Sequence, residues 1–420
     1  MIQKELFDKG LFNTDFLASD TSHKRQREPY FDFKGIKASE GIYGIHPYPA
    51  MFHYRVVREL IKNFSNDNSI VFDPFLGSGV SAVESIISRR NFIGYDINPL
   101  GVLISKVRTT PIPTRELLET LNFIVQNFDN QAAEKPSFTN IDYWFNESVA
   151  KSLSKIKKTI LQIQDRVRDF FLVAFSETVR KVSLTDHNEY KLLKDSSKIV
   201  EDVNVIKTFN EISQRNIKLL TDFYRTNEVS GKIISIQVRN ILDGLDFDYP
   251  ADLIITSPPY GDSRTTVAYG QFSRLSLQWI GINENIDKKS LGGKISKIHT
   301  NLPSETLYTT LKEILKVDER RAVEIFSFYE DLYNAIKVIA KSVKRGGYVC
   351  FVVGNRRVRK VDLPTDIISA EFFINEGLEH IKTIVRKIHN KRIPIQNSPS
   401  NIKGNTDTTM RYEYILILRK

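Results

Sequence analysis

The sequence predicts an α/β fold in which helices cover both faces of a mainly parallel sheet. Three segments carry this prediction, and each is a short apolar run that ends in a polar or turn-forming residue: Val71–Gly79, Asn91–Asp96 and Ile254–Tyr260. Continuous apolar runs that alternate with helical patterns are typical of parallel strands buried on both faces. With 420 residues the chain can bury a large core, and we expect two domains.

The first segment combines a strand with a glycine turn and a helix. Val71–Asp73 has the character of the strand, Gly77 and Gly79 permit a tight turn that a ligand can approach, and a helical spacing begins at Val80. Asp96 ends the next strand about 20 residues further on, where Rossmann-like folds bind ribose hydroxyls. The combination predicts a Rossmann-like fold that binds an adenosine-containing cofactor.

The third segment places two consecutive prolines directly after a strand. Pro258 and Pro259 fix the backbone and carry no N–H donor, which stiffens the chain past the strand end. Carbonyl oxygens there can accept hydrogen bonds from a ligand, and Tyr260 offers a flat face. The segment therefore predicts a socket for a planar, amine-bearing group such as a nucleobase. A turn that merely closes the strand is the alternative.

The remaining elements follow in chain order. Apolar spacings predict a helix after His46–Phe52, several helices from 114 to 228, and one amphipathic helix from Tyr269 to Trp279 with mainly buried aromatics. A helical pattern over Phe328–Val343 ends at Gly346 and Gly347, which we expect to form its C-cap. Three further apolar runs predict strands: 348–353, 381–385 and 412–418.

Two of these motifs together resemble a known family. Asp73-Pro74-Phe75-Leu76-Gly77-Ser78-Gly79 and Thr256-Ser257-Pro258-Pro259-Tyr260 are similar to motifs of the S-adenosylmethionine-dependent amino-methyltransferases of DNA. The segment His46-Pro47-Tyr48-Pro49-Ala50-Met51-Phe52 resembles what precedes the cofactor motif in that family. The resemblance covers residues 43–110, 232–280 and 326–420. It implies a class I methyltransferase fold, with a seven-stranded, mainly parallel sheet that ends in an antiparallel strand.

The family methylates N4 of cytosine or N6 of adenine, and the resemblance assigns roles to individual residues. Ser-Pro-Pro-Tyr is the usual form for cytosine, so Ser257 favours N4 methylation. The implied catalytic residues are Ser257, Pro258, Pro259 and Tyr260: the Ser257 side chain and the Pro258 carbonyl would accept the two amine hydrogens, and Tyr260 would stack on a base swung out of the duplex. The implied residues for S-adenosylmethionine are His46, Pro47, Tyr48, Asp73, Pro74, Phe75, Gly77, Ser78, Gly79, Asp96, Ile97, Asn240 and Asp243.

Three other functions stay open. The chain resembles an N6-adenine DNA methyltransferase almost equally well, and Pro258–Gly261 also fits RNA methyltransferases that act on guanine N2. A non-catalytic nucleic-acid-binding protein could retain the same fold. Methylation at cytosine C5 requires a nucleophilic cysteine, whereas Cys350 lies inside an apolar run. The histidine spacings fit no common ligand pattern, so we expect no metal site.

The net charge of +10 is unevenly spread along the chain. Residues 331–420 contain 17 Lys and Arg against 8 Asp and Glu, a surplus that suits a phosphate backbone. Candidate DNA contacts are Arg356, Arg357, Arg359, Lys360, Lys391 and Arg392. A solubilising surface is the alternative. Double-stranded DNA is the expected partner, and the resemblance also implies a cognate restriction endonuclease in a prokaryotic restriction–modification system.

The sequence divides into four parts. We expect an irregular N-terminal arm (1–42), a methyltransferase domain (43–113 and 229–420), a helical insert (114–228) and, inside the methyltransferase domain, a loop-rich insert (283–325). The helical insert is a candidate for target recognition and equally for a scaffold or dimer interface. No apolar run reaches the roughly 18–20 residues that span a membrane. Without a secretion signal, and with one cysteine, the chain is expected in the prokaryotic cytoplasm.

Overall fold

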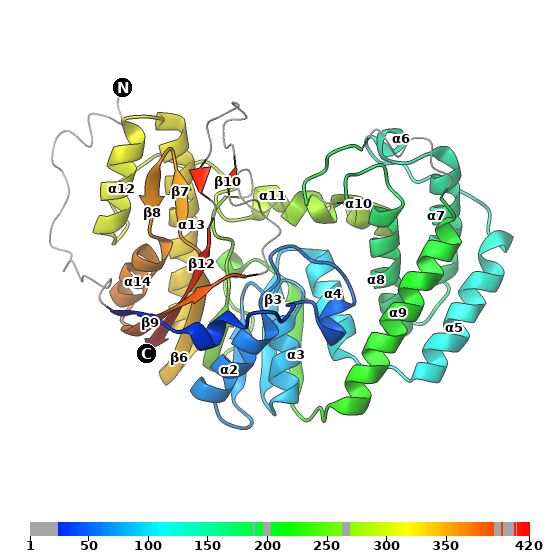
Figure 1. The fold of residues 1–420 in the computed structure, drawn as a ribbon, viewed down its shortest axis with the longest axis horizontal. Helices are drawn as coiled ribbons and strands as arrows, with labels where there is room; N and C mark the ends of the chain where they lie inside the picture. The colour runs from blue at the N-terminus through cyan, green and yellow to red at the C-terminus, as the bar shows by residue number, and fades with distance from the viewer. Residues whose placement is uncertain are drawn as a thin grey trace.

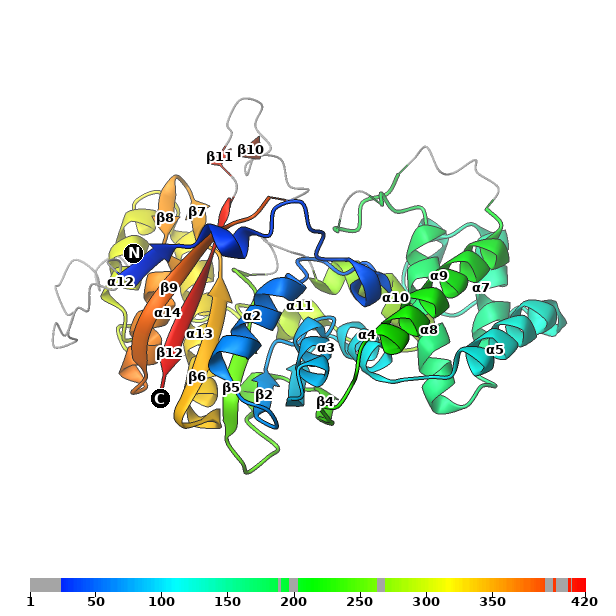
Figure 2. The ribbon, with the colours of Figure 1, turned by 60° about the horizontal axis from the view of Figure 1, so that its bottom comes forward.

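A computed structural model describes residues 24–187, 190–195, 203–262, 269–389, 396–397, 407–408 and 410–420. Its described part contains one large sheet in the order β1-β9-β12-β6-β5-β2-β3-β4 (Figures 1 and 2). The strands are β1 (Arg25–Arg27), β2 (Ile70–Asp73), β3 (Asn91–Asp96), β4 (Ile233–Val238), β5 (Ala251–Thr256), β6 (Val343–Val353), β9 (Glu379–Lys387) and β12 (Tyr412–Arg419). Within this sheet β12 is antiparallel to both its neighbours and every other pair is parallel. The structure therefore confirms a mainly parallel sheet with an antiparallel terminal strand.

The strand β1 adds an eighth strand to the expected seven. It pairs in parallel with β9 at the sheet edge, and Arg25 forms two 2.7 Å hydrogen bonds to the carboxylate of Asp366. The described portion of the N-terminal arm is thus integrated into the core. The 3-10 helices η2 (Pro29–Asp32) and η3 (Gly41–Gly44) then lead the chain towards the helix α2.

The order of the strands reverses between β2 and β5. The chain runs outward from β2 through β3 to β4 in one direction, and outward from β5 to β6 in the other. Ligands of open α/β sheets bind beside the carboxyl ends of the strands at such a reversal. The Gly-containing turn follows β2 and the Pro-Pro segment follows β5, so the topology brings the two motifs to this one point.

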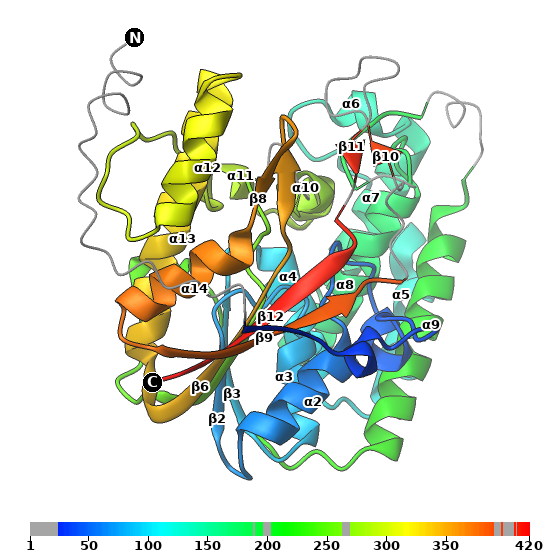
Figure 3. The ribbon, with the colours of Figure 1, turned by 60° about the vertical axis from the view of Figure 1, so that its left-hand side comes forward.

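Helices cover both faces of the sheet (Figure 3). One face carries α2 (Tyr54–Phe64), α3 (Val80–Ile87) and α4 (Pro99–Thr109), and the other carries α12 (Glu305–Leu315), α13 (Glu319–Ser342) and α14 (Thr365–Asn375). Each face has its own hydrophobic core, and the strand side chains alternate between the two. In the described part of the chain no helix is long and apolar enough to cross a bilayer.

A group of helices stands at one side of the sheet (Figure 1, right). It consists of α5 (Thr114–Asn127), α6 (Ile141–Trp144), α7 (Glu147–Ile160), α8 (Asp165–Lys181) and α9 (Val205–Thr226). The helix α10 (Tyr269–Ile280), which comes from the catalytic part, packs along α8. Its Trp279 is fully buried against the rings of Phe145 and Phe175. These aromatic contacts join the helical insert firmly to the core.

Two expectations differ from the structure. The interval 283–325 is more helical than its polar composition suggested, because it contains α11 (Ile286–Lys289) and α12, whose Leu307 and Leu311 are fully buried. Gly346 and Gly347 do not cap a helix. The helix α13 ends at Ser342 and the strand β6 follows at once, with Gly346 at φ +76° where the register on β5 shifts.

The other small elements are scattered along the described chain, and the first of them contacts α5 and α7 in the helical insert. They are η4 (Phe128–Asn130), η6 (Ile241–Asp243), the hairpin β7–β8 (Arg356–Val358 and Val361–Leu363) and the pair β10–β11 (Gln396–Asn397 and Asp407–Thr408).

Candidate active site

The carboxylate of Asp73 joins the two motifs. Asp73 ends β2 and is almost fully buried, and its Oδ1 accepts a 2.7 Å hydrogen bond from the hydroxyl of Thr256, the last residue of β5. Its Oδ2 accepts a 2.5 Å bond from Ser81 on α3, and the N–H of Phe75 donates to Oδ1 at 3.0 Å. Burial raises the pKa of Asp73 to about 6, although these donors favour the charged form. Asp73 therefore fixes the relative position of both strand tips and the glycine turn.

The glycine turn has a backbone that favours residues without a side chain. Gly77 has φ +53° and Gly79, which precedes α3, has φ +82°. A Cβ atom at Gly79 would come within 2.2 Å of the Ser105 hydroxyl oxygen, and one at Gly101 would lie 2.7 Å from the Gly77 carbonyl oxygen. The close packing of the turn on α4 thus depends on glycine on both sides.

Asp96 reaches the same turn from the tip of β3. Its Oδ2 accepts a 2.7 Å hydrogen bond from the Gly77 N–H, and its Oδ1 accepts a 2.8 Å bond from the Asn98 N–H. A carboxylate offers about four lone-pair sites, so two remain for a ligand. Asp96 is partly exposed to the cavity described next, yet desolvation raises its pKa to about 6.

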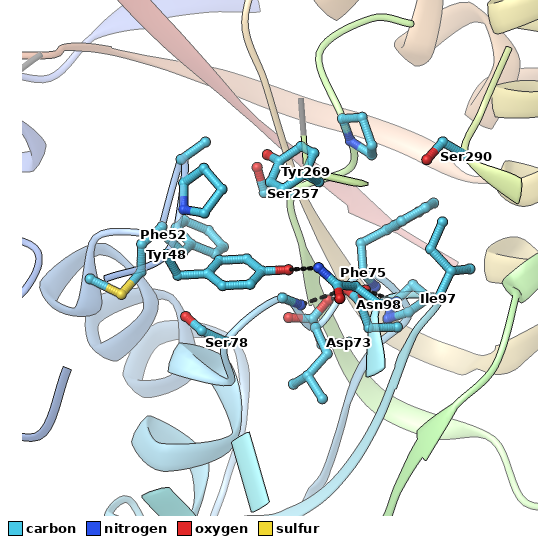
Figure 4. A pocket seen from close by; sticks show the side chains of 18 of the residues that line it. Tyr48, Phe52, Asp73, Phe75, Ser78, Ile97, Asn98, Ser257, Tyr269 and Ser290 are labelled. Atoms are coloured by element: carbon cyan, nitrogen blue, oxygen red, sulfur yellow. Dashed lines mark hydrogen bonds between the residues drawn. The ribbon is translucent and has the colours of Figure 1, made fainter. Parts of the chain in front are cut away.

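A pocket opens between these elements (Figure 4). Aromatic and aliphatic side chains such as Tyr48, Phe75 and Ile97 form its walls, and the polar groups of Asp73, Asp96 and Asn98 converge on it. Ser257 lies at the rim that faces β5. A concave, mainly apolar space with a few convergent polar groups is the usual form of a small-molecule site.

Many of the residues assigned to this site from the sequence do line the cavity. They are Tyr48, Asp73, Pro74, Phe75, Gly77, Ser78, Asp96, Ile97, Asn240, Ser257 and Pro259. Asp243 is exposed and does not line it, whereas Asn240 at the same strand end does. Pro47, Gly79, Pro258 and Tyr260 lie outside the lining as well.

His46 stands behind the cavity wall. Its Nδ1 is 2.6 Å from the Pro47 carbonyl oxygen and its Nε2 is 3.0 Å from the hydroxyl of Ser176 on α8. Desolvation lowers the pKa of the buried ring to about 4, so the ring stays neutral at physiological pH. His46 therefore connects the helical insert to the segment behind the cavity wall without lining the cavity.

Several lining residues were missed in the sequence. The Asn98 amide donates to the hydroxyl of Tyr48 at 3.0 Å and to that of Ser273 at 2.8 Å, and the Asn98-Pro99 helix start directly after Asp96 was the available signal. Tyr269 belongs to a helix whose aromatics were expected to be mainly buried, and it lines the cavity from the first turn of α10. Pro49, Ala50, Met51 and Phe52 come from the recognised segment before the glycine turn but were not assigned a role of their own. Ile286, Lys289, Ser290 and Leu291 come from a segment that carried no recognised motif.

A buried cation, Arg108 on α4, supports the glycine turn from behind. Its guanidinium donates to the Ser78 carbonyl at 2.7 Å and the Ser78 hydroxyl at 2.9 Å, and also to the Tyr43 carbonyl at 2.7 Å. Desolvation lowers the pKa of Arg108 to about 10, so it remains charged near neutral pH. These acceptors are uncharged, which leaves a net positive charge close to the turn.

The motif Ser257-Pro258-Pro259-Tyr260 contributes to a short chain of hydrogen bonds. The Ser257 hydroxyl donates to the Tyr260 hydroxyl at 3.1 Å, and the Tyr260 hydroxyl donates to Oε1 of Glu413 on β12, also at 3.1 Å. Burial raises the pKa of Tyr260 well above its usual value. The Tyr260 ring also lies close to the backbone of Gly354, where a Cβ would approach its Cδ2 to 2.8 Å.

The candidate DNA-binding residues are mostly engaged with acidic side chains. Arg356 is largely buried, 3.7 Å from the carboxylate of Asp262, and Arg359 donates to Asp318 at 2.8 Å. Arg357 lies 3.4 Å from Asp362, and Lys360 is exposed. The contacts expected from Lys391 and Arg392 fall outside the described residues. Across the described chain no group of three or more metal-binding side chains occurs.

Comparison with known proteins shows that the chain is similar to DNA methyltransferases. A family model for N6 and N4 methyltransferases, described as DNA methylase, matches residues 7–106. The type II methyltransferase M.MvaI of Kocuria varians is 37% identical, over 99% of this chain and 98% of its own. The type II methyltransferase M.BsoBI of Geobacillus stearothermophilus is 21% identical, over 81% and 79%. Among solved structures, the rRNA methyltransferase aviRa of Streptomyces viridochromogenes covers 92% of this chain and 94% of that one at 12% identity, with a TM-score of only 0.30.

Proposed function

The chain belongs to the N6/N4 DNA methylase family, and on this premise we propose that it is a type II DNA methyltransferase acting on N4 of cytosine. The observation that carries the proposal is the hydrogen bond between Thr256 and Asp73. It holds the cofactor motif and the Ser257-Pro258-Pro259-Tyr260 motif at one edge of the sheet. A methyl donor in the cavity and a base against Ser257 would then be neighbours.

The lining of the cavity suits S-adenosylmethionine in polarity. Two free lone-pair sites on Asp96 suit the ribose hydroxyls, and Ile97 and Phe75 supply apolar surface for the adenine. Tyr48 and the Gly77 turn border the remaining space, where the charge on Arg108 would favour the amino-acid carboxylate. When bound, S-adenosylmethionine supplies an electrophilic methyl group on a sulfonium.

The residues around Ser257 suit an exocyclic amine. The lone pair of such an amine is delocalised into the ring, so the nitrogen is a poor nucleophile until its hydrogens are held out of the plane. The Ser257 oxygen and the Pro258 carbonyl are acceptors in this position, because the prolines remove competing N–H donors. Tyr260 offers its ring to a base that has left the duplex stack. Positioning of the amine then supplies most of the acceleration.

Serine at position 257 supports cytosine as the target. The sequence pattern with an acidic or amide residue at this position is the form that resembles adenine-N6 enzymes. An N6-adenine activity is the second candidate because the family includes both reactions. A restriction endonuclease that recognises the same DNA sequence is the partner that a type II methyltransferase implies.

Nucleoside mass spectrometry on treated DNA tests the function. Unmethylated double-stranded DNA is incubated with the enzyme and deuteromethyl-labelled S-adenosylmethionine, and then digested to nucleosides. The proposal expects labelled N4-methylcytosine, with bulk tRNA as a matched control that takes up no label. Labelled N6-methyladenine would show that the target base is adenine and not cytosine. Label in guanine of the tRNA would indicate an RNA methyltransferase, and DNA binding without label would indicate a non-catalytic protein.

A further inference from the structure

Three side chains behind the catalytic serine form a directed relay of hydrogen bonds. Glu413 lies on β12 opposite Arg386 on β9, and the Arg386 guanidinium donates to Glu413 Oε2 at 2.6 Å. The other oxygen, Oε1, receives the Tyr260 hydroxyl at 3.1 Å. The Tyr260 oxygen in turn receives the Ser257 hydroxyl at 3.1 Å. Arg386 is 5% exposed and also donates to the Phe31 carbonyl at 2.9 Å, so the outer end of the relay is anchored in the core.

Glu413, at the end of the relay, determines which group donates and which accepts in each hydrogen bond. A carboxylate can only accept hydrogen bonds, so the Tyr260 hydroxyl must donate its one hydrogen to Glu413. The Tyr260 oxygen then has lone pairs but no proton to offer, and it accepts the proton of Ser257. With that proton committed, the Ser257 oxygen presents only lone pairs to the cavity rim.

A serine hydroxyl without this constraint could rotate. It could donate its hydrogen to the nitrogen of the target amine or to a ring nitrogen of the base. In either case the hydroxyl would be a donor to the base and would not hold the amine hydrogen. An aspartate at the same position is an acceptor in any orientation. A serine hydroxyl acts only as an acceptor towards the base when a neighbouring group accepts its hydrogen.

We propose that Glu413 is a positioning residue for methyl transfer, which acts through Tyr260 to hold Ser257 as an acceptor of a target-amine hydrogen. This inference rests on the proposed amine methylation. Glu413 touches neither the cofactor cavity nor the base in this arrangement, and its effect passes through two hydroxyl groups. Burial keeps the Tyr260 hydroxyl protonated far above neutral pH, so the relay keeps its direction throughout the working range.

A double-mutant cycle tests the relay. Single-turnover methyl-transfer rates are measured for the wild type, Glu413→Gln, Ser257→Ala and the double variant, with cofactor and DNA saturating. The glutamine keeps the shape of Glu413 but can donate its amide hydrogens to Tyr260 and reverse the relay. In the wild-type background we expect Glu413→Gln to lower the methyl-transfer rate by about tenfold, which corresponds to the loss of one charge-assisted hydrogen bond. In the Ser257→Ala background the same substitution should lower the rate by less than about twofold. The Pro258 carbonyl leaves the alanine variant a rate that radiolabel can follow.

Two further variants distinguish positioning from damage to the fold. Tyr260→Phe keeps the stacking face but removes the middle hydroxyl, so it should slow the reaction as much as Glu413→Gln does. The double variant with both substitutions should be little slower than either single variant. Tyr333→Phe removes a hydroxyl that donates to Glu376 at 2.6 Å on the remote face and should leave the rate unchanged. Dissociation constants for DNA and cofactor should stay within about twofold in all variants.

The outcomes separate the inference from the function. Equal losses from Glu413→Gln with and without Ser257, or no loss in either, would overturn the relay while leaving methyl transfer intact. A wild-type enzyme that transfers no methyl group to DNA would overturn the proposed function, and the relay with it. A loss that depends on Ser257 supports both.

Discussion

The hydroxyl of Thr256 donates a 2.7 Å hydrogen bond to the buried carboxylate of Asp73. These residues are 183 positions apart in the chain, and each is the last residue of its strand. The contact lies where the strand order reverses, at the point where open α/β sheets bind ligands. It therefore sets the distance between the cofactor turn and the residues that follow β5.

Removal of this hydroxyl should destabilise the protein in a pH-dependent way. Thr256→Val keeps the volume but withdraws a donor from a buried carboxylate, which should cost about 2 kcal/mol of unfolding free energy at pH 7.5. Asp73 has a pKa raised to about 6 in the folded protein, so its ionisation above pH 6 disfavours folding and the Thr256 bond offsets part of that cost. The deficit of the variant should therefore shrink as the pH falls from 7.5 to 5.

The matched control is Thr178→Val. The Thr178 hydroxyl is equally buried but donates to a neutral carbonyl, that of Ala174, at 2.9 Å. Its deficit in urea unfolding should not change with pH. A Thr256→Val deficit that is constant from pH 5 to 7.5 would contradict the role assigned to the Asp73 charge.

Gly79→Ala should lower the free energy of unfolding by more than the strain of a left-handed backbone alone would cost. Gly79 (φ +82°) and Gly377 (φ +82°) share one backbone conformation, but a Cβ at Gly79 would collide with Ser105 whereas nothing lies within 4 Å of Gly377. Gly377→Ala should cost about 1 kcal/mol in urea unfolding, and Gly79→Ala at least about 3 kcal/mol, because it adds a steric clash to the same strain. Similar costs at the two sites would show that the turn is not tightly packed.

Cofactor affinity should depend on pH through Asp96. Its pKa near 6 means that the carboxylate gains its charge between pH 5 and 7, and only the charged form accepts from two ribose hydroxyls without a competing proton. Calorimetric titration with S-adenosylhomocysteine should show affinity that rises over this interval. Asp96→Asn should weaken binding about tenfold at pH 7.5 and flatten the profile. A steep profile that persists in Asp96→Asn would assign the titration to another group, with Asp73 the first candidate.

Truncation of Arg108 should destabilise the glycine turn and weaken cofactor binding. Arg108→Met leaves the Ser78 carbonyl and hydroxyl and the Tyr43 carbonyl without a buried donor, at a cost of about 3 kcal/mol. The exposed Arg359, which pairs with Asp318 at 2.8 Å, provides the control, because Arg359→Met should cost under about 1 kcal/mol. Equal effects on thermal unfolding would contradict the supporting role of Arg108.

Local sequence signals predicted the centre of this fold well. Strand, glycine turn and helix at 71–87, and strand followed by prolines at 251–259, each follow from residues close together in the chain. The strand ends also predicted the part of the cavity lining that directly follows them, because parallel strands present their carboxyl ends at one edge. The lining residues Lys289, Ser290 and Leu291 were not predictable in this way, since they reach the cavity through tertiary packing of a segment without a motif.

The failures have a similar cause. The pairing of β1 with β9 depends on a partner more than 350 residues away, and three polar residues give no local strand signal. Gly346 and Gly347 resembled a helix cap, but the pairing of β6 with β5 extends the strand across them. The role of Glu413 was equally invisible, because β12 brings it to Tyr260 only in the folded sheet.

A crystal structure with S-adenosylhomocysteine, the product of methyl transfer, tests the central claim most directly. The account predicts the nucleoside beside Asp96 and Ile97, the amino-acid portion at the Gly77 turn, and the sulfur directed towards Ser257. Binding at any place from which the sulfur cannot face Ser257 would contradict it, because the two strand ends would then not form one active site.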